Sequence, residues 1–487
     1  MVMNFPMSNK NLAKNCIPEN VTKIHLIAIC GTGMGALAGM LKDKGFTVSG
    51  SDRNIYPPMS DFLSHKKIFV ADGFLPKNLS NEPDLVVIGN AVSRDNPEVM
   101  ETIRRGLNFC SMPQAINHFG VADNHTILIA GTHGKTTTSS ILAWILYQAG
   151  QEDEKFDPSY FIGGILENFK SNYRIGKGSY MVIEGDEYDT AFFDKGPKFL
   201  HYDPLIAVLT SVEFDHADIF KDLDHVKRTF NRFLSQLSSD THLLIFDQDK
   251  NIARLVKEKR CEIYAYGPNP DSAWHLKRFF VHPPWTFFEV YSQGRHFDNF
   301  KTRLMGRHNL MNTLAAIAAA TRLHVPRQTI KKALELFQGV KRRQEVRGIK
   351  NGITIIDDFA HHPTAVKETL CALKPFCTNG RLIAVFEPRT NSSMRKVFQN
   401  VYPLVFDQAD LICICRPSLL HKIPPDERFS AEKLVSDLKA RGKNALYFPH
   451  TGSIVDYLAG NTVTGDYILV MSNGAFDNIH EKLLDAL

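Results

Sequence analysis

The sequence predicts an α/β protein made of three units in series, built around parallel, doubly wound sheets. Apolar strand segments alternate with helical segments along most of the chain, which is typical of βαβ folds. Two glycine-rich turns, at 31–35 and 131–134, each follow an apolar strand and precede a helical segment. The length of 487 residues suits two to four domains with separate hydrophobic cores.

The first unit begins with an apolar strand and the first glycine-rich turn, and a helix then extends through Leu41. Its strands are expected at 23–31, 46–52 and 84–92. A second unit begins near Val121, with strands expected at 125–131, 180–189 and 205–216. A third unit begins near Gln344, with strands expected at 352–360, 381–388, 409–415 and 466–474.

Two further segments of the second unit have distinctive compositions. The aromatic, irregular stretch 246–301 predicts a small antiparallel insert. The alanine-rich stretch 306–323 predicts a long helix whose small side chains allow close packing. No internal repeat of solenoid period is present.

The composition is that of an ordinary soluble globular protein, with 44% hydrophobic and 22% charged residues. The net charge of +5 is small for this length, so it fits charged small molecules and gives little support for nucleic acid. The eight cysteines form no CxxC pair, so neither a zinc site nor a disulfide framework is expected. Because no apolar run has transmembrane length and the first twenty residues contain no apolar segment, we expect a cytoplasmic protein without a membrane partner.

The second glycine-rich turn has the features of a phosphate-binding loop. It comprises Gly131, Thr132, His133, Gly134, Lys135, Thr136 and Thr137. Backbone N–H groups at such a turn bind anions, the lysine reaches the β- and γ-phosphates, and the next hydroxyl holds Mg²⁺. Because Ile129 occupies the position of the first glycine in the standard spacing, a plain strand–helix turn is the alternative.

Acidic groups follow two apolar strands of the same unit. The first group, at the end of the apolar strand in segment 180–189, is Glu184, Asp186, Glu187 and Asp189. The second contains His216 between two aspartates. Ligands collect at the carboxyl ends of parallel strands, and carboxylates there suit a hard cation such as Mg²⁺. The alternatives are a solvated acidic turn and a structural histidine.

The first glycine-rich turn resembles a dinucleotide fingerprint. Gly31, Gly33 and Ala36 have its spacing, and Asp52 follows at the distance expected of a ribose-binding acid. The pattern is compatible with NAD, FAD or a nucleotide sugar. Two nucleotide-binding units in one chain favour a reaction between two nucleotide-bearing molecules over that of a dehydrogenase.

Two polar turns of the third unit are ambiguous from their residues alone. His361 and His362 follow two aspartates, which fits either a metal pair or a polar turn before Pro363. Arg389 and Asn391 follow another strand, where a guanidinium can bind a carboxylate or simply lie in a surface loop.

Six motifs in order, GTHGKTT, EGDEYD, EFDHAD, GRHNLMN, KRRQE and DDFAHHPT, resemble those of the Mur ligases, the ATP-dependent amide-forming enzymes of peptidoglycan synthesis. The resemblance extends from about Lys23 to Leu487. It implies a Rossmann-like UDP-sugar-binding domain at 1–121, a P-loop ATPase domain at 122–343 and a Rossmann-like, peptide-binding domain at 344–487. It also implies that the His361–His362 turn is not a metal site.

The resemblance assigns a role to each candidate residue. It implies that the UDP-sugar is bound by Gly31, Gly33, Gly35, Ser51, Asp52 and Asn90. It places ATP on the phosphate-binding loop, Asn309, Asn312, Arg343 and Asp358. It implies that Mg²⁺ is organised by Thr136, Glu184 and His216. The implied catalytic residues are Lys135, His216 and Arg343. The implied peptide contacts are Arg389, Asn391, Ser472 and Asn473.

The sequence departs from the family pattern in two places. Thr210 and Ser211 replace a threonine–asparagine pair, so that contact is expected to be lost or water-mediated. Asn231 and Arg232 lie where several relatives have a carbamylated lysine, so no such modification is expected.

The activity implied by the resemblance is ATP-dependent ligation of UDP-N-acetylmuramate through an acyl phosphate. Within the family, the segments ICGTGMG, SGSDRNIYPPMS and VMSNGAF are most similar to the recycling branch, whose amine substrate is L-alanyl-γ-D-glutamyl-meso-diaminopimelate. The alternative is the branch that uses L-alanine. A nicotinamide oxidoreductase and a non-catalytic nucleotide switch are the alternatives from other classes.

Overall fold

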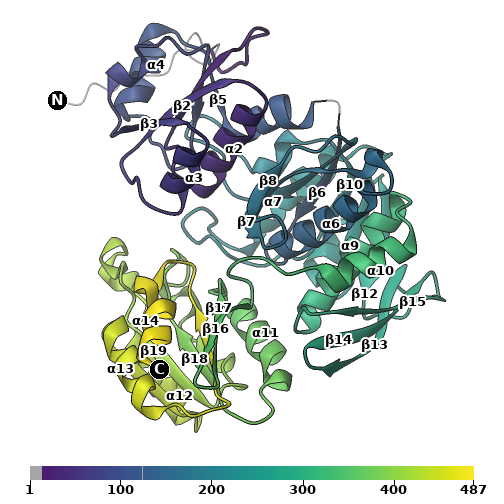
Figure 1. Ribbon diagram of the computed structural model, residues 1–487, viewed down its shortest axis with the longest axis vertical. Coiled ribbons are helices and arrows are strands. Elements are labelled where there is room, and N and C mark those ends of the chain that lie inside the picture. The colour runs from purple at the N-terminus through teal and green to yellow at the C-terminus, as the bar shows by residue number, and fades with distance from the viewer. Residues whose placement is uncertain (1–13, 123) are drawn as a thin grey trace.

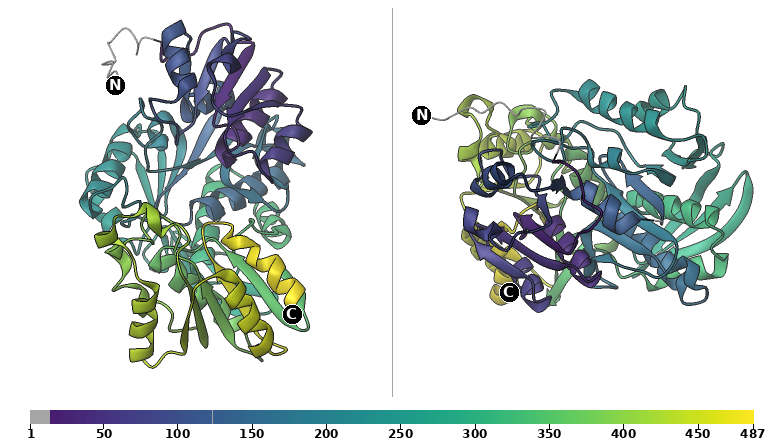
Figure 2. Two further views of the ribbon diagram at one scale, coloured as in Figure 1. Left: turned by 90° about the vertical axis from the view of Figure 1, so that its left-hand side faces the viewer. Right: turned by 90° about the horizontal axis from the view of Figure 1, so that it is seen from above.

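The computed structural model describes residues 14–122 and 124–487. Residues 1–13, which belong to the N-terminal segment expected not to be a secretion signal, lie outside this range. Figure 1 shows three α/β units: the first at the top, the central one on the right and the third at the lower left. The left panel of Figure 2 shows the central unit lying between the other two along the long axis.

The first sheet has five parallel strands in the order β3-β2-β1-β4-β5. Its strands are β1 (Lys23–Ile27), β2 (Thr47–Asp52), β3 (Phe69–Asp72), β4 (Leu85–Ile88) and β5 (Phe109–Ser111). Its helices are α2 (Thr32–Asp43), α3 (Met59–His65), α4 (Pro97–Arg105) and α5 (Met112–Ala115). Since the order reverses between β1 and β4, the first glycine-rich turn lies at a topological switch point, where α/β folds bind ligands.

The central sheet has ten strands in the order β15-β14-β13-β12-β11-β10-β6-β9-β7-β8. Its central strands, which are parallel, are β6 (His125–Ala130), β7 (Ser159–Leu166), β9 (Tyr180–Gly185), β10 (Pro204–Leu209), β11 (His242–Phe246) and β12 (Glu262–Gly267). The edge strand β8 (Ser171–Arg174) is antiparallel to β7. Its helices are α6 (Lys135–Gly150), α7 (Leu223–Gln236), α8 (Lys250–Leu255), α9 (Arg307–Arg322) and α10 (Arg327–Leu336).

The predicted antiparallel segment is an extension of the central sheet and not a separate insert. Its strands are β13 (Trp274–His282), β14 (Trp285–Ser292) and β15 (Arg295–Thr302). They pair antiparallel with one another, as expected. The start of β13 also pairs with the end of β12, and this pairing joins the hairpins to the sheet edge.

The alanine-rich helix α9 packs against α6, as its composition predicts. Five alanines of α9, at 315, 316, 318, 319 and 320, are fully buried. They share a hydrophobic core with Ile141, Leu142 and Ile145 of α6. Because both helices are buried, the N-terminus of α6 and the phosphate-binding loop before it are held on a rigid support.

The third sheet has six strands in the order β16-β17-β21-β18-β19-β20, all parallel except β16. Its strands are β16 (Glu345–Lys350), β17 (Ile353–Asp358), β18 (Leu382–Phe386), β19 (Leu411–Cys415), β20 (Ala445–Phe448) and β21 (Tyr467–Met471). Its helices are α11 (Pro363–Leu373), α12 (Ala431–Ala440), α13 (Thr451–Asn461) and α14 (Ile479–Ala486). The predicted domain boundaries at 121 and 343 stay predictions. Within the described ranges, every helix is too short or too polar to cross a membrane.

Candidate active site

The loop between β6 and α6 requires glycine at two positions. Gly131 and Gly134 have positive φ values of 132° and 79°. A Cβ on Gly131 would lie 2.2 Å from Oγ1 of Thr210, and a Cβ on Gly134 would lie 2.4 Å from Oδ1 of Asn312. Both the backbone conformation and the available space therefore exclude larger residues.

Thr210 and Ser211, which depart from the family pattern, both contact this loop. Oγ1 of Thr210 donates to the carbonyl oxygens of Ala130 and His133. Oγ of Ser211 accepts the backbone N–H of His133 at 2.8 Å. The end of β10 thus fixes the conformation of the phosphate-binding loop directly.

Lys135 is buried among carboxylates at the start of α6. Its Nζ donates to Oε2 of Glu187 at 2.8 Å and to two backbone carbonyls of the loop. Burial opposes the charged ammonium, but the carboxylates of Glu187, Asp186 and Glu184 outweigh it and raise the pKa of Lys135 above its ordinary value. Lys135 is therefore a fixed cation beside the phosphate-binding turn.

The structure brings together two of the three residues predicted to organise Mg²⁺. Oγ1 of Thr136 donates to Oε1 of Glu184 at 2.8 Å, and the backbone N–H of Gly163 donates to Oε2 at 2.7 Å. Burial, with Asp186 nearby, raises the pKa of Glu184. The Glu184 carboxylate next to a hydroxyl, with a second carboxylate nearby, provides oxygen donors that fit Mg²⁺.

His216, the third predicted Mg²⁺ residue, pairs with Glu187 rather than with Glu184. Its Nε2 lies 3.5 Å from Oε1 of Glu187, an oxygen that is buried and makes no hydrogen bond. Burial opposes the charged imidazolium, but Glu187 and Asp215 prevail and raise the pKa of His216. His216 has a φ of 52°, so its backbone adopts the left-handed conformation at this turn.

A cavity of about 840 Å³ lies between the central and third units, next to the phosphate-binding loop. It is lined by the predicted ATP residues Thr132 to Thr137, Asn309, Asn312, Arg343 and Asp358. Nδ2 of Asn309 donates to Oε1 of Gln344 at 3.0 Å, and Nδ2 of Asn312 donates to Oδ1 of Asn309 at 3.2 Å. The two asparagines therefore connect α9 to the start of the third unit.

Asp358 and Arg343 lie at the third-unit side of this cavity. The carboxylate of Asp358 accepts the backbone N–H groups of Gln344 and Ala360 at 2.8 and 2.7 Å. The guanidinium of Arg343 lies 5.0 Å from the ring centre of Phe359. Burial raises the pKa of Asp358, and the charge of Arg343 opposes this increase. The arginine thus lies at the cavity with its guanidinium next to an aromatic ring.

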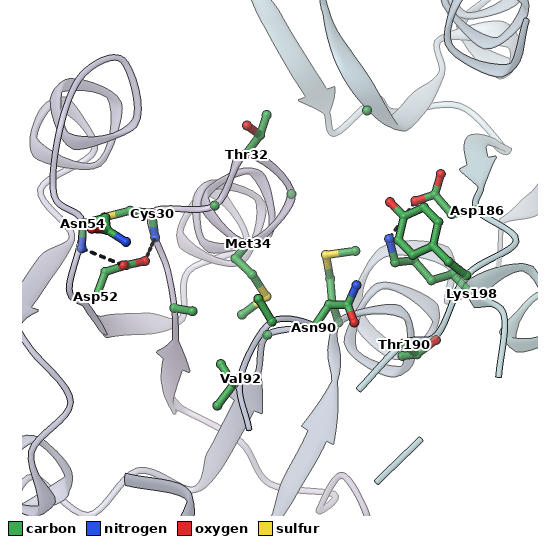
Figure 3. Close-up of a pocket in the computed structure, with 18 of the residues that line it drawn as sticks. Cys30, Thr32, Met34, Asp52, Asn54, Asn90, Val92, Asp186, Thr190 and Lys198 are labelled. Carbon is green, nitrogen blue, oxygen red and sulfur yellow. Dashed lines mark hydrogen bonds and ion pairs between the residues drawn. The ribbon is translucent and has the colours of Figure 1, made fainter. Parts of the chain in front are cut away.

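A second cavity, of about 760 Å³, lies between the first and central units. Figure 3 shows Asp52 and Cys30 on its first-unit wall and Asp186 and Lys198 on the opposite wall. Among the predicted UDP-sugar residues, this cavity is lined by Gly31, Gly33, Asp52 and Asn90. The carboxylate of Asp52 accepts the backbone N–H of Cys30 at 2.9 Å and so fixes the glycine-rich turn.

Two predicted UDP-sugar residues lie away from this cavity. Ser51 is fully buried, and its Oγ donates to Glu98 at 2.5 Å. Successive side chains of a strand point to opposite faces, so the Asp52 side chain faces the cavity while that of Ser51 cannot. Gly35 lies within α2, where a Cβ would come 2.2 Å from Cε of Met59. Gly35 therefore permits close packing of α2 and does not contact the cavity.

The two cavities meet at one group of residues. Five residues line both: Asn90, Gly163, Glu184, Asp186 and Tyr188. Lys135 lines the larger cavity and Lys198 the smaller one. A molecule in each cavity can thus present one end to the same carboxylates.

The four predicted peptide contacts occupy different environments. Oγ of Ser472 donates to Oε2 of Glu387 at 3.0 Å, and Nη1 of Arg389 lies 3.5 Å from the same oxygen. Asn473 lines the larger cavity. Nδ2 of Asn391 donates to Asp218 of the central unit at 3.0 Å. Arg389 and Ser472 are therefore brought together through Glu387, which the sequence analysis did not select.

His361 and His362 contact carboxylates of the central unit. Nε2 of His361 lies 3.7 Å from Asp215, and Nδ1 of His362 lies 3.7 Å from Glu213. His362 also caps α11, since its Nδ1 accepts the backbone N–H of Thr364 at 3.2 Å. This turn therefore forms part of the contact between the central and third units.

Three family profiles match successive parts of the chain. They are "Mur ligase family, catalytic domain" at 23–122, "Mur ligase middle domain" at 129–320 and "Mur ligase, glutamate ligase domain" at 342–474. The chain belongs to the Mur ligase family. The predicted family resemblance and three-part α/β architecture are thereby confirmed.

Similar proteins cover nearly the whole of this Mur ligase. The UDP-N-acetylmuramate–L-alanyl-γ-D-glutamyl-meso-2,6-diaminoheptandioate ligase of Haemophilus influenzae is 37% identical over 466 residues, 95% of this chain and 99% of the relative. The UDP-N-acetylmuramate–L-alanine ligase of Clostridium tetani is 31% identical over 458 residues, 93% and 96% of the two chains. The crystal structure of a murein peptide ligase from Psychrobacter arcticus has 32% identity and a TM-score of 0.70, covering 96% of this chain and 98% of its own.

The structure gives contacts to two residues to which the sequence analysis assigned no role. Glu187 is the ion-pair partner of both Lys135 and His216. Its position in the EGDEYD motif could have identified it as a candidate functional residue. Glu213 accepts a hydrogen bond from Oγ1 of Thr364 at 2.7 Å across the boundary between units. Glu213 is the first residue of the EFDHAD motif, but its contact with Thr364 could not be predicted, because the two residues are 151 positions apart in the sequence.

Proposed function

We propose that this Mur ligase joins UDP-N-acetylmuramate to the tripeptide L-alanyl-γ-D-glutamyl-meso-diaminopimelate and forms ADP and phosphate. The alternative is ligation of UDP-N-acetylmuramate to L-alanine, which the 31% identity to such an enzyme keeps open. The higher identity of 37% to a tripeptide ligase favours the first substrate pair. Use of a preformed tripeptide fits peptidoglycan recycling.

The observation that supports a ligase most directly is the meeting of the two cavities at Glu184 and Asp186. A UDP-sugar in the smaller cavity and ATP in the larger one would direct their reactive ends to the same place. A nicotinamide oxidoreductase would leave the buried Lys135 without a function. A nucleotide switch would not require the smaller cavity.

The chemical task is to convert a carboxylate, which is a poor electrophile, into an amide. Transfer of the γ-phosphoryl group of ATP to the lactyl carboxylate gives an acyl phosphate, which the α-amine of the peptide attacks with loss of phosphate. The protein must mainly position the groups and offset their negative charge. Lys135 would contact the γ-phosphate, and Arg343 would add a second cation from the third unit.

Mg²⁺ bound by Thr136 and Glu184 would neutralise phosphate charge. His216 would act through Glu187, since that carboxylate also holds Lys135. On the third unit, Arg389, Ser472 and Asn473 would recognise carboxylates of the peptide. Contacts between the central and third units would exclude water from the acyl phosphate, which would otherwise hydrolyse.

The proposal is tested by measuring ADP release with UDP-N-acetylmuramate, ATP and Mg²⁺, and comparing the tripeptide with L-alanine as the amine. We expect a much higher kcat/KM for the tripeptide. A higher kcat/KM for L-alanine would favour the alternative. ADP release that is independent of the UDP-sugar would contradict both ligase proposals.

A further inference from the structure

Lys198 is a buried lysine on the central-unit wall of the smaller cavity, outside every motif that the sequence analysis used. Its residue is only 7% exposed, and Figure 3 shows its ammonium directed toward the cavity. It begins a short 3₁₀ turn, Lys198–His201, after the loop that follows the EGDEYD motif. A buried lysine beside a ligand-sized cavity needs a reason, because desolvating an ammonium is unfavourable.

The surroundings of Lys198 fix the position of its charge. Its Nζ donates to Oδ2 of Asp186 at 2.7 Å and lies 4.0 Å from the ring centre of Tyr188. The ammonium of Lys198 is therefore held in place by a carboxylate and an aromatic ring.

The loop before Lys198 is anchored to the first unit. Oγ of Ser111 donates to Oδ2 of Asp194 at 2.8 Å, and His201 lies 2.9 Å from the same carboxylate. Within the loop, Oγ1 of Thr190 donates to the carbonyl of Gly196 at 2.9 Å. The position of Lys198 is thus set by both units that form the cavity, before any ligand enters.

The two cationic side chains among the described residues lining this cavity, Arg53 and Lys198, come from different units. Arg53 is exposed and lies on the first unit, with its guanidinium 5.3 Å from the ring centre of Phe74. Lys198 lies on the central unit, beside the residues shared with the larger cavity. A ligand with anionic groups at both ends, such as a sugar nucleotide with a distal carboxylate, matches this separation.

We propose that Lys198 binds the lactyl carboxylate of UDP-N-acetylmuramate and holds it at the junction of the two cavities. This inference rests on the proposed function and assigns a substrate contact within it. An ammonium has three N–H donors, and Asp186 accepts one of them. The remaining donors can bind the carboxylate, while Lys135, on the larger cavity, contacts the phosphate that will be transferred to it.

The proposed role has a defined electrostatic reason. The carboxylate that attacks the phosphate would have to approach Glu184, Asp186 and Glu187, which repel it. Lys135 is paired with Glu187 and would also serve the phosphate of ATP. Lys198 lines the cavity in which the UDP-sugar would bind and lies beside the carboxylates shared with the larger cavity.

The test compares binding of UDP-N-acetylmuramate with binding of UDP-N-acetylglucosamine, which lacks the lactyl carboxylate. Both affinities are measured by calorimetry for the wild type, for Lys198→Met and for Lys198→Arg. We expect Lys198→Met to lose roughly 10- to 100-fold in affinity for UDP-N-acetylmuramate, as for a lost charge-assisted hydrogen bond. Its affinity for UDP-N-acetylglucosamine should stay within about twofold of the wild-type value. Lys198→Arg should retain most of the wild-type preference for UDP-N-acetylmuramate over UDP-N-acetylglucosamine.

Lys195→Met is the matched control, because Lys195 is in the same loop but exposed and paired with Asp189. It should leave both affinities unchanged. Equal loss of both affinities in Lys198→Met would indicate a purely structural role and overturn the assignment. An unchanged preference of this variant for UDP-N-acetylmuramate over UDP-N-acetylglucosamine would also overturn it. If Lys198→Met does not fold, Lys198→Gln replaces it, since its amide still donates to Asp186.

These binding measurements need neither ATP nor peptide, so they are independent of the ligation assay. A wild type that binds UDP-N-acetylmuramate and releases no ADP would contradict the proposed function and leave the Lys198 assignment to be judged by binding alone. A wild type that binds the two nucleotides equally would overturn the assignment itself.

Discussion

The two glycine-rich turns of this Mur ligase have a similar local design but different electrostatic surroundings. The turn at Gly31 lies between β1 and α2, and the turn at Gly134 lies between β6 and α6. The turn at Gly31 is fixed by Asp52, and its helix begins without a basic residue in the first turn. The helix after Gly134 begins with Lys135 and Thr136, which face three carboxylates.

This difference shows that a glycine-rich turn determines where an anion can bind, but not what happens to it. Backbone N–H groups at a helix N-terminus suffice to hold a pyrophosphate. Phosphoryl transfer additionally requires cations and a metal-binding carboxylate near the reacting oxygen atoms. The first turn therefore suits binding alone, and the second suits chemistry.

The largest expected effect is that of Lys135→Ala. It should reduce the rate of ADP formation by a factor of 10² or more, about 3 kcal/mol in the barrier, as for the loss of one preorganised charge contact. Binding of UDP-N-acetylmuramate should stay within a few-fold, because the two turns serve separate cavities. Lys155→Ala, which removes an exposed lysine paired with Asp153, is the control. Loss of both ADP formation and UDP-N-acetylmuramate binding in a folded Lys135→Ala protein would contradict the separation of the two sites.

Arg389→Ala should have the next largest effect. Removing this guanidinium should lower kcat/KM for the tripeptide by about 2 kcal/mol, as for a lost charge-assisted hydrogen bond. The KM for ATP should remain unchanged, since Arg389 is beside Glu387 and not among the residues lining the larger cavity, where we propose that ATP binds. Steady-state kinetics with varied tripeptide measure the effect. Unchanged use of the tripeptide would remove Arg389 from the peptide site.

Asp52→Ala tests the first turn. The variant loses the acceptor for the backbone N–H groups of Cys30 and Asn54, so the turn should lose its fixed conformation. We expect affinity for UDP-N-acetylmuramate to fall by about 1.5 kcal/mol, the lower end of the contribution of hydrogen bonds to a charged group. Calorimetry should show no change in ATP affinity. Unaltered affinity for the sugar nucleotide would show that Asp52 is dispensable to the site.

The smallest effect is expected for Thr364→Val, which removes a hydroxyl but preserves the side-chain shape. This hydroxyl donates to Glu213 across the boundary between the central and third units. Its loss should raise the KM for ATP a few-fold, equivalent to about 1 kcal/mol for one hydrogen bond. The UDP-sugar affinity should not change. A similar rise in the KM for ATP and in the dissociation constant for the UDP-sugar would indicate general destabilisation.

Features that depend on local sequence were predicted well. The strands, the glycine-rich turns and the alanine-rich helix follow from residues that are neighbours in the chain, so their signals are contained in short segments. The grouping of Lys135, Thr136 and Glu184 could also be predicted, because the strand ends of a parallel sheet meet at one edge.

Features that depend on side-chain direction or on distant partners were not predictable in this way. Ser51 and Asp52 are adjacent, but strand geometry sends only Asp52 toward the cavity. Glu387 binds Ser472, which is 85 residues away. Lys198 lies in a loop without a recognisable motif, and only folding brings it to the cavity wall.

Glu213 has a consequence for how ATP and the third unit affect each other. Its Oε2 is shared between His133 of the phosphate-binding loop, at 3.3 Å, and Thr364 of the third unit, at 2.7 Å. Any movement of the loop that alters the first contact therefore changes the free energy of the second. Thermodynamic reciprocity then requires that docking of the third unit changes nucleotide affinity by the same factor by which nucleotide changes docking. One oxygen atom thus couples occupancy of the loop to the position of a domain.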